Sequence, residues 1–191
     1  FGAAAGHNRY EHRADLLRQM LWGGFEGNEA TRWGTQMEPV ACAAYEKLKR
    51  AELTPPSHFA VKHTGLLVSP ETPWLGVSPD GIIEDGEELG LLEIKCPFSK
   101  KLYPDEDPHG IRHYYYDQVQ GIMGLQGLPW CDFAQWTPTG TNIRRIAFDR
   151  EYWSSDLRPA LLDFNFDMFL PNLFMKEDGL LAEAEVTPGA L

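Results

Sequence analysis

Residues 78–99 read SPDGIIEDGEELGLLEIKCPFS, and this stretch predicts the centre of the fold. Its second half is apolar except for Glu93 and Lys95, a pattern typical of a short strand. Because alternate side chains of a strand point to opposite faces, Glu93 and Lys95 are expected to lie side by side on one face. The polar, glycine-containing segment 84–90 predicts a hairpin, which would bring Asp80 back alongside Glu93.

The three charged residues of this hairpin favour a catalytic site. Two carboxylates and a lysine at the end of a small sheet suit a hard divalent cation held by oxygen ligands, with Lys95 steadying a water or a phosphate. A glutamate and a lysine two apart on a strand are more often a solvated edge. Here both interrupt an apolar run, and an unpaired buried charge is costly unless a partner or a metal compensates it. The sequence therefore favours a metal-dependent site.

Composition bounds the class of protein. The chain has 191 residues, of which 43% are hydrophobic and 12% aromatic, so we expect one globular domain with a substantial core. No apolar run approaches the ~20 residues that span a bilayer, so no membrane partner is expected. Cys42, Cys96 and Cys131 have no CxxC spacing and predict reduced thiols of a cytosolic protein. The chain begins at Phe1, so we expect its natural start to lie upstream.

The net charge of −11 argues only superficially against a nucleic-acid partner, because net charge does not report where the charges lie. The basic residues form three small groups in the sequence: Lys95, Lys100 and Lys101; Arg144, Arg145 and Arg150; and Arg9, Arg13 and Arg18. Groups of this size are usually solvated faces, so they permit DNA binding without demonstrating it.

The hydrophobic pattern predicts one α/β domain over residues 1–175 and an acidic, poorly packed tail over residues 176–191. Helices are expected over residues 11–21, 31–50, 113–128 and 149–173, and further strands over residues 58–68, 74–78, 130–136 and 143–148. Pro39 predicts either a start or a kink in the second helix, and Pro159 and Pro171 should interrupt the last one.

Three polar residues lie within these predicted helices. Glu38 is at the edge of an apolar stripe, where it is either a rim residue or a third metal carboxylate. Gln118 and Gln120 lie among apolar residues, and a glutamine on a semi-buried helix face is more often a satisfied hydrogen-bonding residue than a catalytic one.

The order of these motifs resembles the phage-lambda-type alkaline exonucleases, also called YqaJ-type viral recombinases, of the PD-(D/E)xK nuclease superfamily. The matching segments are WGTQMEPVACAAYE, SPDG, EIKCPFS and YYYDQVQ, and the resemblance covers residues 1–170. The superfamily signature alone is short, whereas four segments in this order and spacing are specific. The resemblance implies a restriction-endonuclease-like core, with a central mixed β-sheet flanked by helices.

The resemblance also implies the metal ligands. Asp80 and Glu93 would bind the catalytic metals, with the carbonyl of Ile94 as a further ligand, and Glu38 would complete a second metal position. Two Mg²⁺ ions are expected, and Mn²⁺ should substitute for them.

Other roles follow from the same resemblance. Lys95 would orient or help to deprotonate the water, and Gln118 would hold the water or the scissile phosphate, with Tyr115 nearby. DNA contacts are expected from a further set of residues: Ser99, Lys100, Lys101, Arg144 and Arg145.

The implied activity is that of a 5′→3′ exonuclease on the ends of linear double-stranded DNA. It would leave 3′ single-stranded tails for an annealing protein in recombination, and the enzyme would form a trimeric ring. The expected location is the cytoplasm or the interior of a host cell, or the nucleus for a eukaryotic virus. In the family an arginine and a serine upstream of the segment matching Phe1 help to recognise the 5′ phosphate, and this sequence starts after them.

Three alternatives stay open. A structure-specific endonuclease of the same superfamily would share the metal site. An iron–sulfur relative would need four cysteine ligands, and the sequence has three cysteines that are not clustered. A non-catalytic DNA-binding module on a nuclease fold would be expected to have lost a ligand or the lysine, and all are present.

Overall fold

The computed structural model describes residues 1–24, 26–52, 58–102 and 109–186. The chain divides into two compact units. The first comprises Phe1–Glu26, Ile111–Gly121 and Asp149–Leu191, and the second comprises Gly27–Gly110 and Ile122–Phe148.

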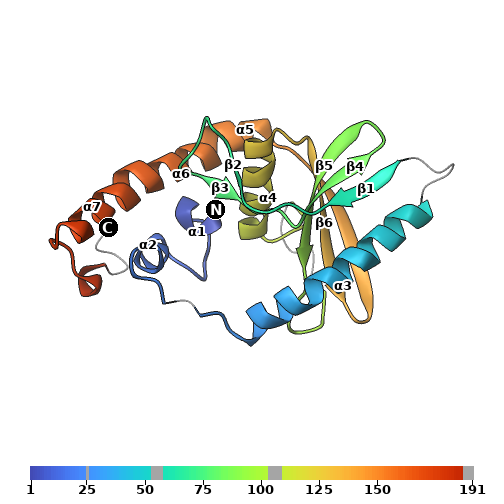
Figure 1. Ribbon diagram of the computed structural model, residues 1–191, viewed down its shortest axis with the longest axis horizontal. Helices are drawn as coiled ribbons and strands as arrows, with labels where there is room; N and C mark the ends of the chain where they lie inside the picture. The colour runs from blue at the N-terminus through green and yellow to red at the C-terminus, as the bar shows by residue number, and fades with distance from the viewer. Residues whose placement is uncertain (25, 53–57, 103–108, 187–191) are drawn as a thin grey trace. The chain divides into compact units, whose positions relative to one another are not determined.

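A five-stranded sheet forms the centre of the second unit (Figure 1). In spatial order its strands are β1 (Phe59–Lys62), β4 (Gly81–Asp85), β5 (Glu88–Lys95), β6 (Trp130–Thr137) and β7 (Gly140–Ala147). The β5–β6 pair is parallel and the other neighbouring pairs are antiparallel, so the sheet is mixed. The expected α/β fold with a central mixed sheet is therefore confirmed.

The helix α3 (Glu29–Glu52) lies along this sheet in Figure 1. Its buried residues Ala41, Cys42 and Tyr45 belong to a hydrophobic cluster with Ile83 and Leu92 of the sheet. The helix runs through Pro39 instead of starting there. A proline inside a helix removes one backbone hydrogen bond. The helix continues on both sides of Pro39 because its apolar face packs on the sheet.

The first strands are shorter than the sequence predicts. The expected strand over residues 58–68 is divided into β1 and β2 (Leu67–Val68), and β2 pairs with β3 (Gly76–Val77) in a separate two-stranded sheet. The polar segment His63-Thr64-Gly65 lies between them. An alternating apolar pattern does not continue through it, which accounts for the division.

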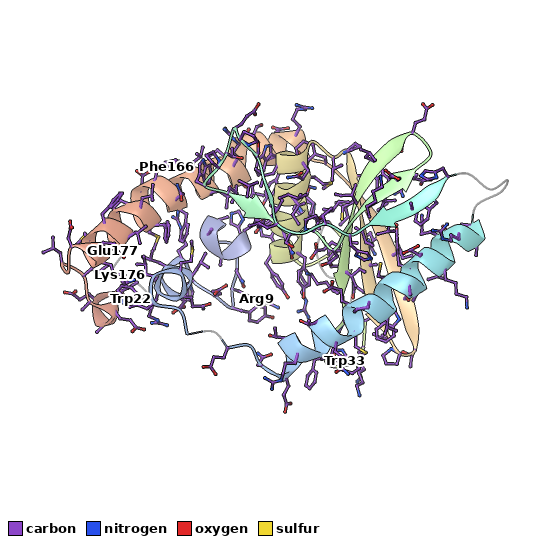
Figure 2. The ribbon with its side chains drawn as sticks, viewed as in Figure 1. Arg9, Trp22, Trp33, Phe166, Lys176 and Glu177 are labelled. Carbon is purple, nitrogen blue, oxygen red and sulfur yellow. The ribbon has the colours of Figure 1, made fainter. Side chains whose placement is uncertain are left out.

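Helices make up the first unit. They are α1 (Gly2–Ala5), α2 (Arg13–Trp22), α5 (Arg150–Tyr152), α6 (Arg158–Asp163), α7 (Leu170–Glu177) and the short 3₁₀-helix η3 (Glu183–Glu185). The helix α4 (His113–Gln126) contributes residues to both units. Figure 2 shows Trp22 near Lys176, whose ammonium lies 5.7 Å from the centre of the indole ring.

The C-terminal helix is widened, not broken, near its prolines. Two π-helical segments, Trp153–Leu157 and Phe164–Phe169, separate α5, α6 and α7. Pro159 and Pro171 follow these segments, each in the first turn of the next α-helix. A proline cannot donate to the preceding turn, and a π-bulge is one way for a helix to accommodate such a lost bond.

The tail is packed at one point. Val186 is only 1% exposed, which differs from the loose packing expected for residues 176–191. Residues 187–191 lie outside the described part of the chain. Among the described helices, none combines the length and the apolar character needed to cross a bilayer.

Gly90→Ala should destabilise the sheet. A Cβ at Gly90 would lie 2.2 Å from Cζ3 of Trp130, which is itself only 7% exposed. Since a buried indole ring cannot move aside freely, we expect the free energy of unfolding to fall by about 2 kcal/mol or more in urea titrations.

Gly140→Ala is the matched control, because no atom lies within 4 Å of a Cβ at that strand position. It should change the free energy of unfolding by less than about 0.5 kcal/mol. Equal stabilities of the two variants would contradict the packing of Trp130 on Gly90.

Candidate active site

The pairing of β4 with β5 places Asp80 beside Glu93. Gly81 of β4 is opposite Leu92 of β5, and Asp80 directly precedes Gly81. Oδ2 of Asp80 accepts a hydrogen bond of 2.6 Å from the backbone N–H of Ile94. The hairpin thus brings the two carboxylates together as the sequence predicts.

Glu93 and Lys95 lie on the same face of β5. Nζ of Lys95 donates to Oε1 of Glu93 at 2.5 Å, and Glu93 is only 2% exposed. The alternation of side chains along the strand accounts for this contact. A lysine that neutralises a buried carboxylate lowers the cost of burial.

Burial dominates the electrostatics of Glu93. Burial and the charges of Asp80 and Glu38 together raise the pKa of Glu93 to about 7, against the charge and the hydrogen bond of Lys95. Burial alone would lower the pKa of Lys95, but the charge and hydrogen bond of Glu93 raise it above its usual value. The lysine is therefore held in its protonated form.

Asp80 and Glu38 have raised pKa values for the same reason. Burial raises the pKa of Asp80, although the N–H of Ile94 and the charge of Lys95 oppose this effect. Burial also raises the pKa of Glu38, and the charge of Asp80 adds to the shift. Three carboxylates thus repel one another within one site, and this repulsion is what a bound cation would relieve.

A pocket of 360 Å³ opens at these residues. Its lining includes Glu38 and Cys42 of α3, Asp80 before β4, Ile94 of β5 and His63 after β1. The pocket is therefore lined by both α3 and the sheet of the second unit. Three of the predicted ligands, Glu38, Asp80 and Ile94, are among its lining residues.

His63 is a site residue that the sequence analysis did not identify. Its Nδ1 lies 3.1 Å from the carbonyl oxygen of Asp80, and its Nε2 lies 3.7 Å from Sγ of Cys42. The signal for it is the antiparallel β1–β4 pairing, in which Lys62 is opposite Ile82, so that the next residue, His63, comes to the level of Gly81, one residue from Asp80. No local motif in the sequence reveals that pairing.

The cysteines of this unit have raised pKa values. Burial raises the pKa of Cys42 and that of Cys96 to about 11, and the neighbouring carboxylates add to both shifts. Cys131 is buried, and its pKa is raised further for the same reason. In the metal-free pocket the Cys42 thiol is therefore protonated, and beside it lie the imidazole of His63 and the carboxylates of Glu38 and Asp80. Carboxylate oxygens fit a hard ion such as Mg²⁺.

The predicted site residues on α4 belong to the first unit. The ring of Tyr115 packs against that of Tyr114, and the two ring centres are 4.4 Å apart. Gln118 lies in the same helix, and the roles of Tyr115 and Gln118 in the site remain predictions. Gln120 has a structural contact, because its Oε1 accepts a 2.8 Å hydrogen bond from the N–H of Asp149.

The candidate DNA contacts occupy two places in the second unit. Ser99, Lys100 and Lys101 follow β5, and the ammonium of Lys100 lies 5.1 Å from the ring centre of Trp33, which Figure 2 labels on α3. All three residues are exposed.

Arg144 and Arg145 lie on β7. Arg145 donates to both oxygens of buried Asp132, at 2.7 and 3.0 Å, and stacks 3.6 Å from the ring centre of Trp130. Arg145 thus has a structural contact in the sheet, and DNA binding by both arginines remains a prediction.

Comparison with known protein families gives an independent finding. The family described as the YqaJ-like viral recombinase domain matches residues 1–129. An uncharacterised protein, R354 of Acanthamoeba polyphaga mimivirus, is 29% identical over 138 residues. That alignment covers 66% of this chain and 24% of the viral protein, so the chain spans about a quarter of its relative's length.

Solved structures agree with this match. The alkaline exonuclease LHK-Exo from Laribacter hongkongensis is 25% identical, with a TM-score of 0.65 over 93% of this chain and 90% of that one. The same exonuclease in complex with dAMP is 26% identical, with a TM-score of 0.62 over 92% and 87% of the two chains. The described fold is thus similar to that of an alkaline exonuclease along almost its whole length.

Glu93 should make the metal-free protein less stable at about pH 8 than at about pH 5. Between its usual pKa of 4.5 and its raised pKa of about 7, the folded protein holds a proton that the unfolded chain has lost. The free energy of unfolding therefore falls as the pH rises through this window, by at most about 3 kcal/mol. Glu93→Gln should remove this part of the fall, measured by urea unfolding in EDTA.

Glu88→Gln is the control, because Glu88 is an exposed carboxylate on the same strand. It should keep the pH dependence of the unsubstituted protein. If the Glu93→Gln and Glu88→Gln profiles coincide, the raised pKa of Glu93 is wrong.

Proposed function

The chain belongs to the YqaJ-like viral recombinase domain family, and from this premise we propose that it is a metal-dependent deoxyribonuclease. We propose further that it is a 5′→3′ exonuclease that hydrolyses one strand from the ends of linear double-stranded DNA. The observation that carries the proposal is the meeting of Asp80, Glu93 and Lys95 beside a pocket. Residues 1–175 would form one exonuclease domain.

Asp80, Glu93 and the carbonyl of Ile94 would hold the catalytic Mg²⁺, and Glu38 would contribute to a second position. All but the buried Glu93 line the same pocket. When bound, Mg²⁺ would lower the pKa of a water and neutralise charge on the phosphate. Mn²⁺ accepts the same oxygen ligands and should support the reaction.

Lys95 would act as a cationic donor. Its raised pKa keeps it protonated, which supports a role in orienting the attacking water or a phosphate oxygen over a role as a base. Negative charge grows on the phosphate as the bond to the leaving oxygen breaks, and a fixed ammonium stabilises that charge. Gln118 would hold the water or the scissile phosphate, with Tyr115 nearby.

The proposed substrate is DNA held by its backbone. Ser99, Lys100 and Lys101 are exposed, and residues of this kind bind phosphates irrespective of sequence. The alkaline exonuclease LHK-Exo is known in complex with dAMP, a deoxynucleoside monophosphate, and this supports mononucleotides as the products here. Arg144 and Arg145 would add positive charge from β7.

The wider setting belongs to the same proposal. The 3′ tails would pass to a single-strand annealing protein for recombination, and the enzyme would work as a trimeric ring. The viral relative supports a location inside a host cell. A structure-specific endonuclease remains the alternative, since it would use the same ligands.

Digestion of linear and closed circular duplex DNA tests the proposal. With Mg²⁺, the protein should release mononucleotides from 5′-phosphorylated linear duplex and leave the circle intact; in EDTA it should do neither. Asp80→Asn, Glu93→Gln and Lys95→Ala should each lower the rate at least about 100-fold, because each removes a charge at the reacting phosphate.

Lys62→Ala is the matched control, since Lys62 is an exposed lysine of the same sheet that pairs with Glu84. It should digest DNA at the unsubstituted rate. Cleavage of the circle would favour the endonuclease, and DNA binding without hydrolysis would favour a non-catalytic module.

Metal titrations separate the roles of Glu38 and Gln118. Glu38→Ala should lower activity and raise the Mg²⁺ concentration needed for half-maximal rate by about 10-fold, because it weakens one metal position. Gln118→Ala should lower the maximal rate with little change in that concentration, because a neutral amide is a poorer Mg²⁺ ligand than a carboxylate. Titrations that overlay the unsubstituted enzyme at full activity would contradict both roles.

A further inference from the structure

His7, His113 and Asp117 form a second cluster of metal-ligating side chains, within the first unit. A nitrogen of each histidine and a carboxylate oxygen of Asp117 all lie within 4.8 Å of one another. Nδ1 of His7 is 3.2 Å from Oδ1 of Asp117, and Nε2 of His113 is 3.9 Å from the same oxygen. We propose that these three side chains bind a zinc-type transition-metal ion, which the proposed nuclease chemistry does not use.

The distances suit a tetrahedral ion. Ligand atoms about 2.0–2.1 Å from a tetrahedral Zn²⁺ lie about 3.4 Å from one another. The His7–Asp117 separation already has this length, and the His113–Asp117 separation would close by about half an ångström. His113 and Asp117 are four residues apart on α4, which places them on one helix face.

The donor types select the ion. Two imidazole nitrogens and one carboxylate oxygen suit Zn²⁺ or Co²⁺, whereas Mg²⁺ prefers oxygen ligands alone. Asp117 is fully buried, and the side chains of His7 and His113 are 23% and 40% exposed. The carboxylate thus lies at the buried side of the site, and the two histidines lie at its solvent-exposed side. An ion would enter from this exposed side, where a water would be its fourth ligand.

Outer contacts would hold these ligands in place. The hydroxyl of Tyr152 donates a hydrogen bond to Oδ1 of Asp117. If Nδ1 of His7 binds the ion, Nε2 faces Oδ1 of Asp156 at 3.9 Å. A carboxylate behind a ligating histidine is a frequent second partner in zinc sites.

An ion here would join two distant segments, since His7 follows α1, and His113 and Asp117 lie in α4. Tyr152 of α5 would hold Asp117 from a third segment. The backbone already approaches closely, because a Cβ at Gly2 would lie 3.0 Å from Oδ2 of Asp117. The expected role is structural: a bound ion stabilises the folded first unit, in which the ligands are assembled.

Zinc binding in excess Mg²⁺ tests the proposal. The full chain is dialysed against Zn²⁺ with millimolar Mg²⁺ present to compete for the pocket at Asp80, and bound zinc is measured by atomic emission. We expect one zinc per chain, a visible absorption band of tetrahedral type with Co²⁺, and a melting temperature raised by about 5 °C at saturating zinc. His7→Asn and His113→Gln should each lose all three effects.

His58→Asn is the matched control, because His58 is an exposed histidine that contacts Glu84 in the other unit. It should bind zinc as the unsubstituted chain does. Should His7→Asn fail to fold by circular dichroism, His113→Gln decides alone, since its partly exposed position tolerates the change. Failure of the unsubstituted chain to bind zinc, or unchanged binding by His113→Gln, overturns the proposal.

Discussion

The candidate active site depends on one constraint: a buried carboxylate, Glu93, in the middle of an apolar sheet. Its neighbours in the sequence, Leu92 and Ile94, are buried with it, so the strand cannot turn its charge to solvent without exposing its apolar face. The charge must then be compensated where it lies. Lys95, a bound proton and a bound cation are the available compensations, and the lysine and the cation are the two that the proposed phosphodiester hydrolysis would use.

The same constraint fixes the register of the hairpin. The 2.6 Å bond from Ile94 N–H to Asp80 forms only if Gly81 lies opposite Leu92. Close packing enforces this register, because a Cβ at Gly81 would meet Val61 at 2.6 Å and one at Gly90 would meet Trp130. A shift by one residue would turn Glu93 to the opposite face, so the packing of the sheet and the geometry of the site are selected together.

The sequence predicts those contacts that follow from the pairing of neighbouring strands in one hairpin. Asp80, Glu93 and Lys95 were found because one hairpin and the alternation of a strand bring them together. His63 was missed because the pairing of β1 with β4 joins segments about twenty residues apart, and no motif marks it. The π-helical segments were also missed, since a proline in the sequence predicts a disruption but not its form. The His7–Asp117 contact spans 110 residues and has no local signal at all.

The two proposed metal sites have different sets of donor atoms. The pocket at Asp80 offers the carboxylates of Glu38 and Asp80 together with the imidazole of His63, and burial raises the pKa of its thiol, Cys42. The cluster at His7 offers imidazoles, which a strongly hydrated Mg²⁺ does not favour. Occupation of one site therefore need not compete with occupation of the other. An ion exchanged at the proposed active site would leave the proposed zinc-type ion in place, since the two sets share no residue.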